Sequence, residues 1–130
     1  MIVRKVLNIE DLPSKHVAVR RALERCGVPY IDHADNAVDA LDMIEAAITD
    51  GKPYDVIVSD MYFPISKGGM EAQAGMYVIE ELEARGIDVP VIVCSSARMV
   101  IPEIVGCIHY SARNDLDADM RELLDVVRNM

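Results

Sequence analysis

The chain has 130 residues, of which 52% are hydrophobic and 27% charged, and its formal net charge is −9. This length suits one domain around a single core, residues 1–130, and the composition is globular, without disordered or low-complexity segments. The negative charge argues against direct binding to nucleic acid or to an anionic membrane, and it favours a divalent cation or a basic protein surface.

The sequence also predicts the compartment. The apolar runs are only a few residues long, so we expect no transmembrane segment, and the charged N-terminal stretch argues against a secretory signal. Cys26, Cys94 and Cys107 lie in apolar surroundings and form no CxxC pair. They indicate reduced core thiols in a cytoplasmic protein rather than a disulfide framework or a metal site.

Short apolar runs alternate with longer segments of helical periodicity along the whole chain. The runs that predict strands are Val3–Ile9, Tyr30–His33, Tyr54–Ser59, Val89–Cys94 and Cys107–Ala112. The segments that predict helices are Ser14–Cys26, Ala37–Thr49, Gly75–Arg85 and Leu116–Arg128. This alternation predicts a parallel sheet with right-handed crossovers and helices on both faces. We therefore expect a doubly wound, flavodoxin-like α/β domain with strand order 2-1-3-4-5.

Acidic residues follow the two strands between which this strand order reverses, where such folds bind ligands. Glu10 and Asp11 come after the first predicted strand, and Asp60 comes after the third. Carboxylates gathered at one point repel one another, and a hard cation such as Mg²⁺ relieves the repulsion. The sequence therefore predicts a magnesium site beside a carboxylate that can attack a phosphoryl group. The structural alternative is that Glu10 and Asp11 only favour the positive end of the next helix.

Five stretches, in order, resemble the receiver domains of bacterial two-component response regulators. They are IEDLP, ADNAVDAL, VIVSDMYFP, VPVIVCSSA and GCIHYSAR, and the resemblance extends over nearly the whole chain. It implies phosphorylation by a histidine kinase. It also implies that Asp60 is the phosphoacceptor, that Asp11 binds Mg²⁺ directly, and that Glu10 holds the waters of the metal. The backbone carbonyl of Tyr62 would complete the coordination.

The resemblance also assigns a switch to two later positions. Ser95 takes the place of the hydroxyl residue that bonds the phosphoryl oxygen in the family. Tyr110 takes the place of the aromatic residue whose burial follows the movement of that hydroxyl, although a simple core aromatic is an equally good interpretation of Tyr110.

The chain departs from the family pattern after the fifth predicted strand. The family has a lysine followed by proline there, and this chain has Arg113 followed by Asn114. Arginine pairs with phosphate but presents a longer, planar group than lysine does. We assign Arg113 to the phosphoryl group, with a solvent-exposed arginine as the rival interpretation.

Two further segments depart from the pattern. The segment after Asp60 carries the insert ISKGGMEAQA, in which Lys67 is a second candidate for a phosphate-binding cation. Between Ser95 and Gly106, Pro102 predicts that the fourth helix of the family is short or irregular here. The apolar residues of that segment indicate core positions, with a protein-interaction surface as the alternative.

The leading hypothesis is a stand-alone receiver without an output domain. It would take a phosphoryl group on Asp60 from a histidine kinase or phosphotransfer protein and act on a downstream target protein. The sequence leaves open whether the protein forms a homodimer. The rival is a pseudo-receiver, a protein-interaction module that works without phosphorylation, which Arg113 motivates. We expect no enzymatic activity beyond self-dephosphorylation. An aspartyl-phosphate phosphatase is disfavoured, since Tyr62 stands where that chemistry needs a second acid.

Overall fold

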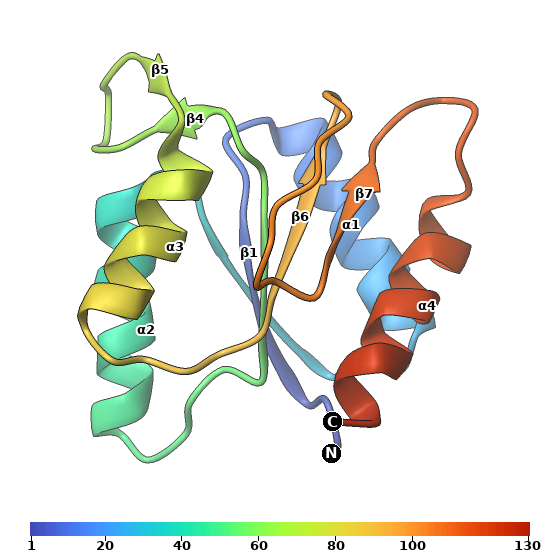
Figure 1. Cartoon of the computed structure of the whole chain (residues 1–130), viewed down its shortest axis with the longest axis horizontal. Helices are drawn as coiled ribbons and strands as arrows, with labels where there is room; N and C mark the ends of the chain where they lie inside the picture. The colour runs from blue at the N-terminus through green and yellow to red at the C-terminus, as the bar shows by residue number, and fades with distance from the viewer.

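A five-stranded parallel sheet forms the centre of the computed structural model, which describes residues 1–130 (Figure 1). Its strands are β1 (Lys5–Ile9), β2 (Tyr30–Ala34), β3 (Val56–Ser59), β6 (Val91–Ser95) and β7 (Gly106–His109). The order across the sheet is β2-β1-β3-β6-β7, and all neighbours are parallel. Counted within this sheet alone, that order is 2-1-3-4-5, so the predicted flavodoxin-like fold is confirmed.

Helices cover both faces of the sheet (Figure 1). The helices are α1 (Pro13–Arg25), α2 (Ala37–Thr49), α3 (Ala74–Ala84) and α4 (Leu116–Arg128). Helices α1 and α4 lie together on one face, and α2 and α3 lie on the other. Because successive side chains of a strand point to opposite faces, β3 contributes Val56 and Val58 to the core under α1 and α4, and Ile57 to the core under α2 and α3.

Local sequence signals fix where three of the helices begin. The side chain of Asn36 accepts a hydrogen bond from the Asp39 N–H at 2.9 Å and caps α2. Asp115 caps α4 in the same way through the Ala118 N–H at 3.1 Å. Helix α1 begins with Pro13, whose missing N–H costs nothing in the first turn. The predicted ranges of α2 and α4 match the observed ones.

Several strands are shorter than the apolar runs predicted. Val3, Tyr54 and Val89 lie outside the strands, although Val3 and Tyr54 are buried. The fifth predicted strand ends at His109 rather than at Ala112. An apolar run reports burial, and burial continues into loops beyond the last hydrogen-bonded pair of a sheet, so these boundaries were wrong by a few residues.

The insert after Asp60 contains structure that the sequence did not predict. Strands β4 (Phe63–Pro64) and β5 (Glu71–Ala72) pair antiparallel and form a small hairpin above α2 and α3, at the end of the sheet where the main strands finish (Figure 1). The side chain of Phe63 is fully buried. The Val38 N–H of α2 donates to the Ile65 carbonyl at 2.8 Å, which ties the insert to the start of that helix.

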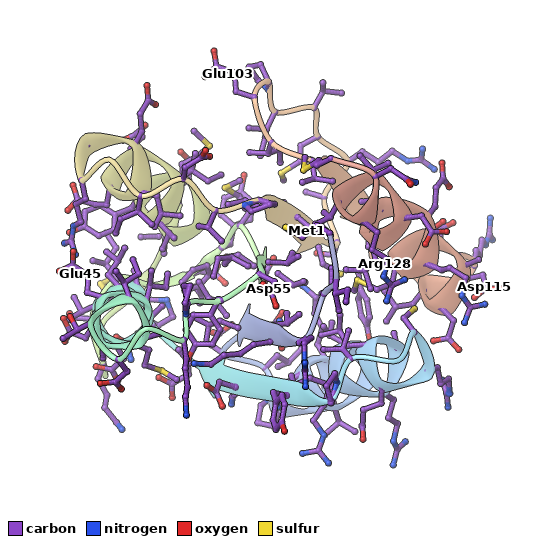
Figure 2. The ribbon with its side chains drawn as sticks, turned by 90° about the horizontal axis from the view of Figure 1, so that it is seen from below. Met1, Glu45, Asp55, Glu103, Asp115 and Arg128 are labelled. Carbon is purple, nitrogen blue, oxygen red and sulfur yellow. The ribbon has the colours of Figure 1, made fainter.

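The connection between β6 and β7, residues 96–105, contains no helix. The sequence predicted a short or irregular helix here, and Pro102 together with the left-handed backbone of Glu103 (φ 70°) accounts for its absence. Figure 2 shows Glu103 at the outer margin of the molecule on this connection. Met99 and Ile104 pack against the core, whereas Val100 is 95% exposed.

Two further expectations from the sequence concern membrane-spanning segments and the cysteines. No helix in the structure combines the length and the apolar character needed to cross a bilayer. Cys26, Cys94 and Cys107 are free thiols, and Cys94 is buried in the core.

We predict that Gly75→Ala destabilises the protein, although alanine normally favours a helix. A Cβ atom at Gly75 would lie 2.5 Å from the Asp60 carbonyl oxygen and 2.8 Å from the Met61 Cα, and backbone cannot move aside easily. We expect a loss of about 1–3 kcal/mol in the free energy of unfolding, measured by urea denaturation. Gly106→Ala is the control, since its Cβ would meet only the flexible Leu123 side chain. Equal stability of Gly75→Ala and wild type would contradict the prediction.

Candidate functional site

The pairing of β1 with β3 brings the predicted acidic residues to one point. Ile9 and Ser59 are partners in the sheet, and the Asp60 N–H donates to the Ile9 carbonyl at 3.0 Å. Glu10 and Asp60 therefore leave the sheet side by side. Each of Glu10, Asp11 and Asp60 offers a carboxylate oxygen, and these oxygens lie within 4.8 Å of one another.

The three carboxyl groups differ strongly in exposure. Glu10 is 1% exposed, Asp60 is partly buried and Asp11 is exposed. Burial raises the pKa of Glu10 to about 7, although the neighbouring ammonium of Lys15 opposes the shift. A cation bound at this point would favour the ionised form of Glu10.

The two side-chain oxygens of Asp60 have different surroundings. Oδ1 accepts a hydrogen bond from the Met61 N–H at 2.7 Å and lies 3.2 Å from the Lys15 Nζ. Oδ2 accepts no hydrogen bond from the protein, so one oxygen is held by hydrogen bonding while the other remains free to react. The neighbouring Ser59 hydroxyl donates to the backbone carbonyl of Asp60 at 2.7 Å and helps fix the chain there.

The sequence interpretation missed Lys15, which is 4% exposed and lies inside the acidic cluster. Its Nζ donates to the Cys94 carbonyl at 2.7 Å and lies 2.9 Å from the Glu10 Oε1. Burial alone would lower the pKa of Lys15, but Glu10 and Asp60 outweigh it and the net shift is upward, so the side chain is an ammonium. The three contacts join the ends of β1, β3 and β6 through one residue of α1.

A helical period could have identified Lys15. The buried residues of α1 are Lys15, Val19, Ala22 and Leu23, which are spaced as one face of a helix. Val17, an apolar residue of the same helix, lies off this face and is 41% exposed. A lysine on the buried stripe, a few residues after an acidic pair, was the available signal.

The two predicted switch residues lie at neighbouring strand ends. Ser95 ends β6, is 1% exposed, and its Oγ accepts a long hydrogen bond from the Ala97 N–H at 3.3 Å. Tyr110 directly follows β7, and its N–H donates to the Ser95 carbonyl at 2.8 Å. The Tyr110 ring centroid lies 5.2 Å from the Lys15 Nζ, within reach of a cation–π interaction.

The other predicted site residues lie outside this set of contacts. Arg113 is exposed and its guanidinium makes no hydrogen bond or ion pair, while Asn114 donates to the His109 carbonyl at 2.7 Å. Lys67 is exposed in the insert and forms no ion pair. Tyr62 is 38% exposed in the loop after Asp60. Metal binding by the Tyr62 backbone carbonyl and phosphate binding by Arg113 both stay predictions.

A stacked histidine pair lies next to the acidic cluster. The rings of His16 and His33 have centroids 3.7 Å apart and planes inclined by 13°. His33 Nε2 donates to the Glu10 carbonyl at 2.7 Å. The Asn8 amide N–H donates to the Val58 carbonyl, which leaves the Asn8 Oδ1 as an acceptor. His16 Nδ1 therefore carries a proton and donates it to Asn8 Oδ1, with the two atoms 2.7 Å apart. Both rings are thus held as donors at the end of β1.

The donor set fits Mg²⁺. All three converging groups offer oxygen, one of them is exposed for exchange with solvent, and hard divalent cations bind such oxygen ligands with several waters retained. With all three carboxylates ionised, the cluster would carry a charge of −3, and the Lys15 ammonium adds +1. The resulting formal charge of −2 is the charge that one divalent cation neutralises.

Comparison with known proteins places this fold. No protein-family model matches the chain, and no curated protein matches it in sequence. Solved structures do match over nearly the whole length. A LuxR-family DNA-binding response regulator from Staphylococcus aureus has 18% identity and a TM-score of 0.73, with 97% of this chain and 99% of that chain covered. The chemotaxis response regulator CheY4 of Vibrio cholerae has 17% identity and a TM-score of 0.65, with 98% of each chain covered.

A sensor protein from Polaromonas sp. JS666 is similar as well, with 19% identity, a TM-score of 0.72 and 97% of each chain covered. The chain therefore has the fold of response-regulator receiver domains, and the resemblance in its sequence motifs is confirmed at the level of the fold.

We predict that His16 makes the protein less stable at acidic pH. Burial, together with His33 and Arg20, lowers the pKa of His16 below its ordinary value of 6.5. The unfolded chain then binds the proton more readily, so stability present above pH 6.5 is lost as the pH falls through the lower folded pKa. His16→Gln keeps a donor for Asn8 but cannot titrate. Urea denaturation from pH 7.5 to pH 5 should show a smaller loss of stability in this variant than in wild type; parallel losses would refute the assignment.

Proposed function

We propose that the protein is a receiver domain that accepts a phosphoryl group on Asp60. The donor is the phosphohistidine of a histidine kinase or of a phosphotransfer protein. The proposed Mg²⁺ ligands are Glu10 through water, Asp11, Asp60 and the carbonyl of Tyr62. The observation that carries the proposal is the free Oδ2 of Asp60 inside a cluster whose carboxylate oxygens lie within 4.8 Å of one another.

The transfer is a displacement at phosphorus. Oδ2 of Asp60 supplies the electron pair for a new P–O bond, and the P–N bond of the donor breaks with its pair passing to the imidazole nitrogen. The Met61 N–H and Lys15 hold Oδ1, and the carboxylate is thereby kept in one orientation before attack. When bound, Mg²⁺ would supply charge neutralisation for the phosphoryl oxygens.

A response to phosphorylation can begin at Ser95. The added group brings negative charge and acceptor oxygens to the strand ends. The present hydrogen bond of the Ser95 hydroxyl is long, at 3.3 Å, and is therefore readily exchanged for one to a phosphoryl oxygen. Because the Tyr110 N–H is bonded to the Ser95 carbonyl, a shift of Ser95 would move Tyr110 and change the surface seen by a downstream target.

A pseudo-receiver is the second candidate. Two observations favour it, namely the exposed position of Arg113 and the absence of a helix between β6 and β7. Such a module would bind its partner without phosphorylation, and chemical labelling of Asp60 separates the two functions.

We expect acetyl phosphate with Mg²⁺ to phosphorylate wild type at one site, and Asp60→Ala to remove the product because the nucleophile is lost. The measurement is an increase of one phosphoryl group in intact mass. Asp88→Ala is the matched control, since Asp88 is an exposed carboxylate before β6, at the amino ends of the strands and away from Asp60. Labelling that persists in Asp60→Ala would exclude Asp60 as the acceptor, and an unlabelled but folded wild type would favour the pseudo-receiver.

Magnesium should stabilise the folded protein by mass action. At a concentration about 100 times the dissociation constant the gain is about 2.7 kcal/mol, which appears as a higher melting temperature. Asp11→Asn should lose most of this gain, because Asp11 is the exposed ligand and its replacement leaves the fold intact. Asp42→Asn, on the exposed face of α2, should respond like wild type. Sodium chloride at equal ionic strength distinguishes binding from screening, and equal gains in Asp11→Asn and wild type would contradict the assigned site.

A further inference from the structure

One cation in the whole structure contacts the acidic cluster, and it is Lys15. The other ion pairs of the chain lie on its surface, and they join residues in the helices or directly after them. Arg113 and Lys67, the cations that the sequence assigned to the phosphate, are both exposed and unpaired. A phosphoryl group on Asp60 would therefore meet the ammonium of Lys15 before any other positive charge.

We propose that Lys15, reaching the site from α1, is the residue that binds the phosphoryl group on Asp60, in place of a cation after β7. The proposal rests on the proposed function, because it names the anion-binding group of the same site. Its basis is the position of the Lys15 Nζ, 3.2 Å from Asp60 Oδ1 and 2.7 Å from the Cys94 carbonyl oxygen.

The burial of Lys15 is hard to explain as a packing feature. Taking an ammonium out of water costs several kcal/mol, and replacing a buried ion pair by apolar residues is often neutral or stabilising. The neighbouring buried positions of α1 are Val19, Ala22 and Leu23, which shows that this stripe faces an apolar core. A lysine at the end of such a stripe, aimed at a carboxylate with one free oxygen, indicates a chemical role.

The tether to Cys94 sets what the ammonium can reach. Nζ carries three hydrogens, and the structure directs it toward one carbonyl and two carboxylates. After transfer to Asp60 Oδ2, the hydrogen bond to Cys94 can remain while the contact with Glu10 is exchanged for one to a phosphoryl oxygen. Lys15 stays an ammonium throughout, so it neutralises the charge of the transferring group and moves no proton.

The same movement reaches Tyr110. The Lys15 Nζ lies 5.2 Å from the centre of that ring, and a shift toward the phosphoryl group alters this cation–π contact. Lys15 thus links the acceptor directly to the aromatic residue of the proposed switch, in addition to the backbone route through Ser95.

The test compares Lys15→Met with Arg113→Met in the full chain. We measure the rate of phosphorylation by acetyl phosphate at saturating Mg²⁺ and the affinity for beryllofluoride, a phosphoryl mimic, by ¹⁹F NMR. Loss of a charged donor at a developing anion typically slows such reactions about 100-fold, and we expect at least a tenfold loss of rate and affinity in Lys15→Met. Arg113→Met should stay within about twofold of wild type, as expected for an exposed side chain without hydrogen bonds or ion pairs.

Magnesium affinity provides a readout that a damaged fold would not give. Removing the ammonium leaves the carboxylates more negative, so Lys15→Met should bind Mg²⁺ more tightly, as measured by thermal stabilisation, while it is phosphorylated more slowly. Lys15→Gln is the second variant, since its amide can still donate to the Cys94 carbonyl. If Lys15→Met does not fold, the same opposed changes in Lys15→Gln test the proposal.

The outcomes separate the two proposals. Normal labelling and beryllofluoride binding in a folded Lys15 variant, or a loss confined to Arg113→Met, would overturn the role of Lys15 and leave phosphorylation of Asp60 standing. A folded wild type that neither takes up phosphate nor binds beryllofluoride would overturn the proposed function, and the role of Lys15 with it.

Discussion

The ion pairs of Lys15 with Glu10 and Asp60 are the interaction on which the site depends. The parallel register of β1 and β3 forces these carboxylates together, and like charges at such distances repel. The ammonium reduces that repulsion and, through the Cys94 carbonyl, fixes the ends of three strands relative to one another. The free oxygen of Asp60 keeps its orientation because the other oxygen is already held.

The surroundings of this cluster restrict its movement on one side and permit it on the other. Toward β2, His33 donates to the Glu10 carbonyl, and the stacked His16 is fixed by Asn8. Toward β6, the hydroxyl of Ser95 has a single long hydrogen bond. Charge added at Asp60 would therefore be met most easily by the Ser95 hydroxyl, because its hydrogen bond is longer than the 2.7 Å hydrogen bonds of His33 and His16.

The fold could be predicted from the sequence because alternating strand and helix periods leave few chain topologies, and because Asn36 and Asp115 mark helix starts. The acidic cluster followed from the same topology. Lys15 was missed because hydropathy treats a lysine as solvent-exposed. The helical spacing of α1 places it on the buried face, but only the tertiary structure shows that its neighbours are Glu10 and Asp60. The β4–β5 hairpin was not predicted for a related reason. Strands of two residues are too short to show an alternating hydrophobic pattern, and the insert is held by a tertiary hydrogen bond to α2. Arg113 was assigned by its position in the chain, and that position is exposed.

A cation supplied by α1 changes which elements can sense the site. A basic residue after β7 would tie the phosphoryl group to the β7–α4 loop, whereas Lys15 ties it to α1 and, through Cys94, to β6. Helix α1 packs against α4, and β6 leads directly into the helix-free connection of residues 96–105. With Lys15 as the phosphate ligand, a signal can reach that connection through β6 without a helix to carry it. A phosphate-binding lysine on α1 and a helix-free connection between β6 and β7 are therefore compatible in one site. The contact of Lys15 with the Cys94 carbonyl reaches β6 directly, so no helix in residues 96–105 is needed for it.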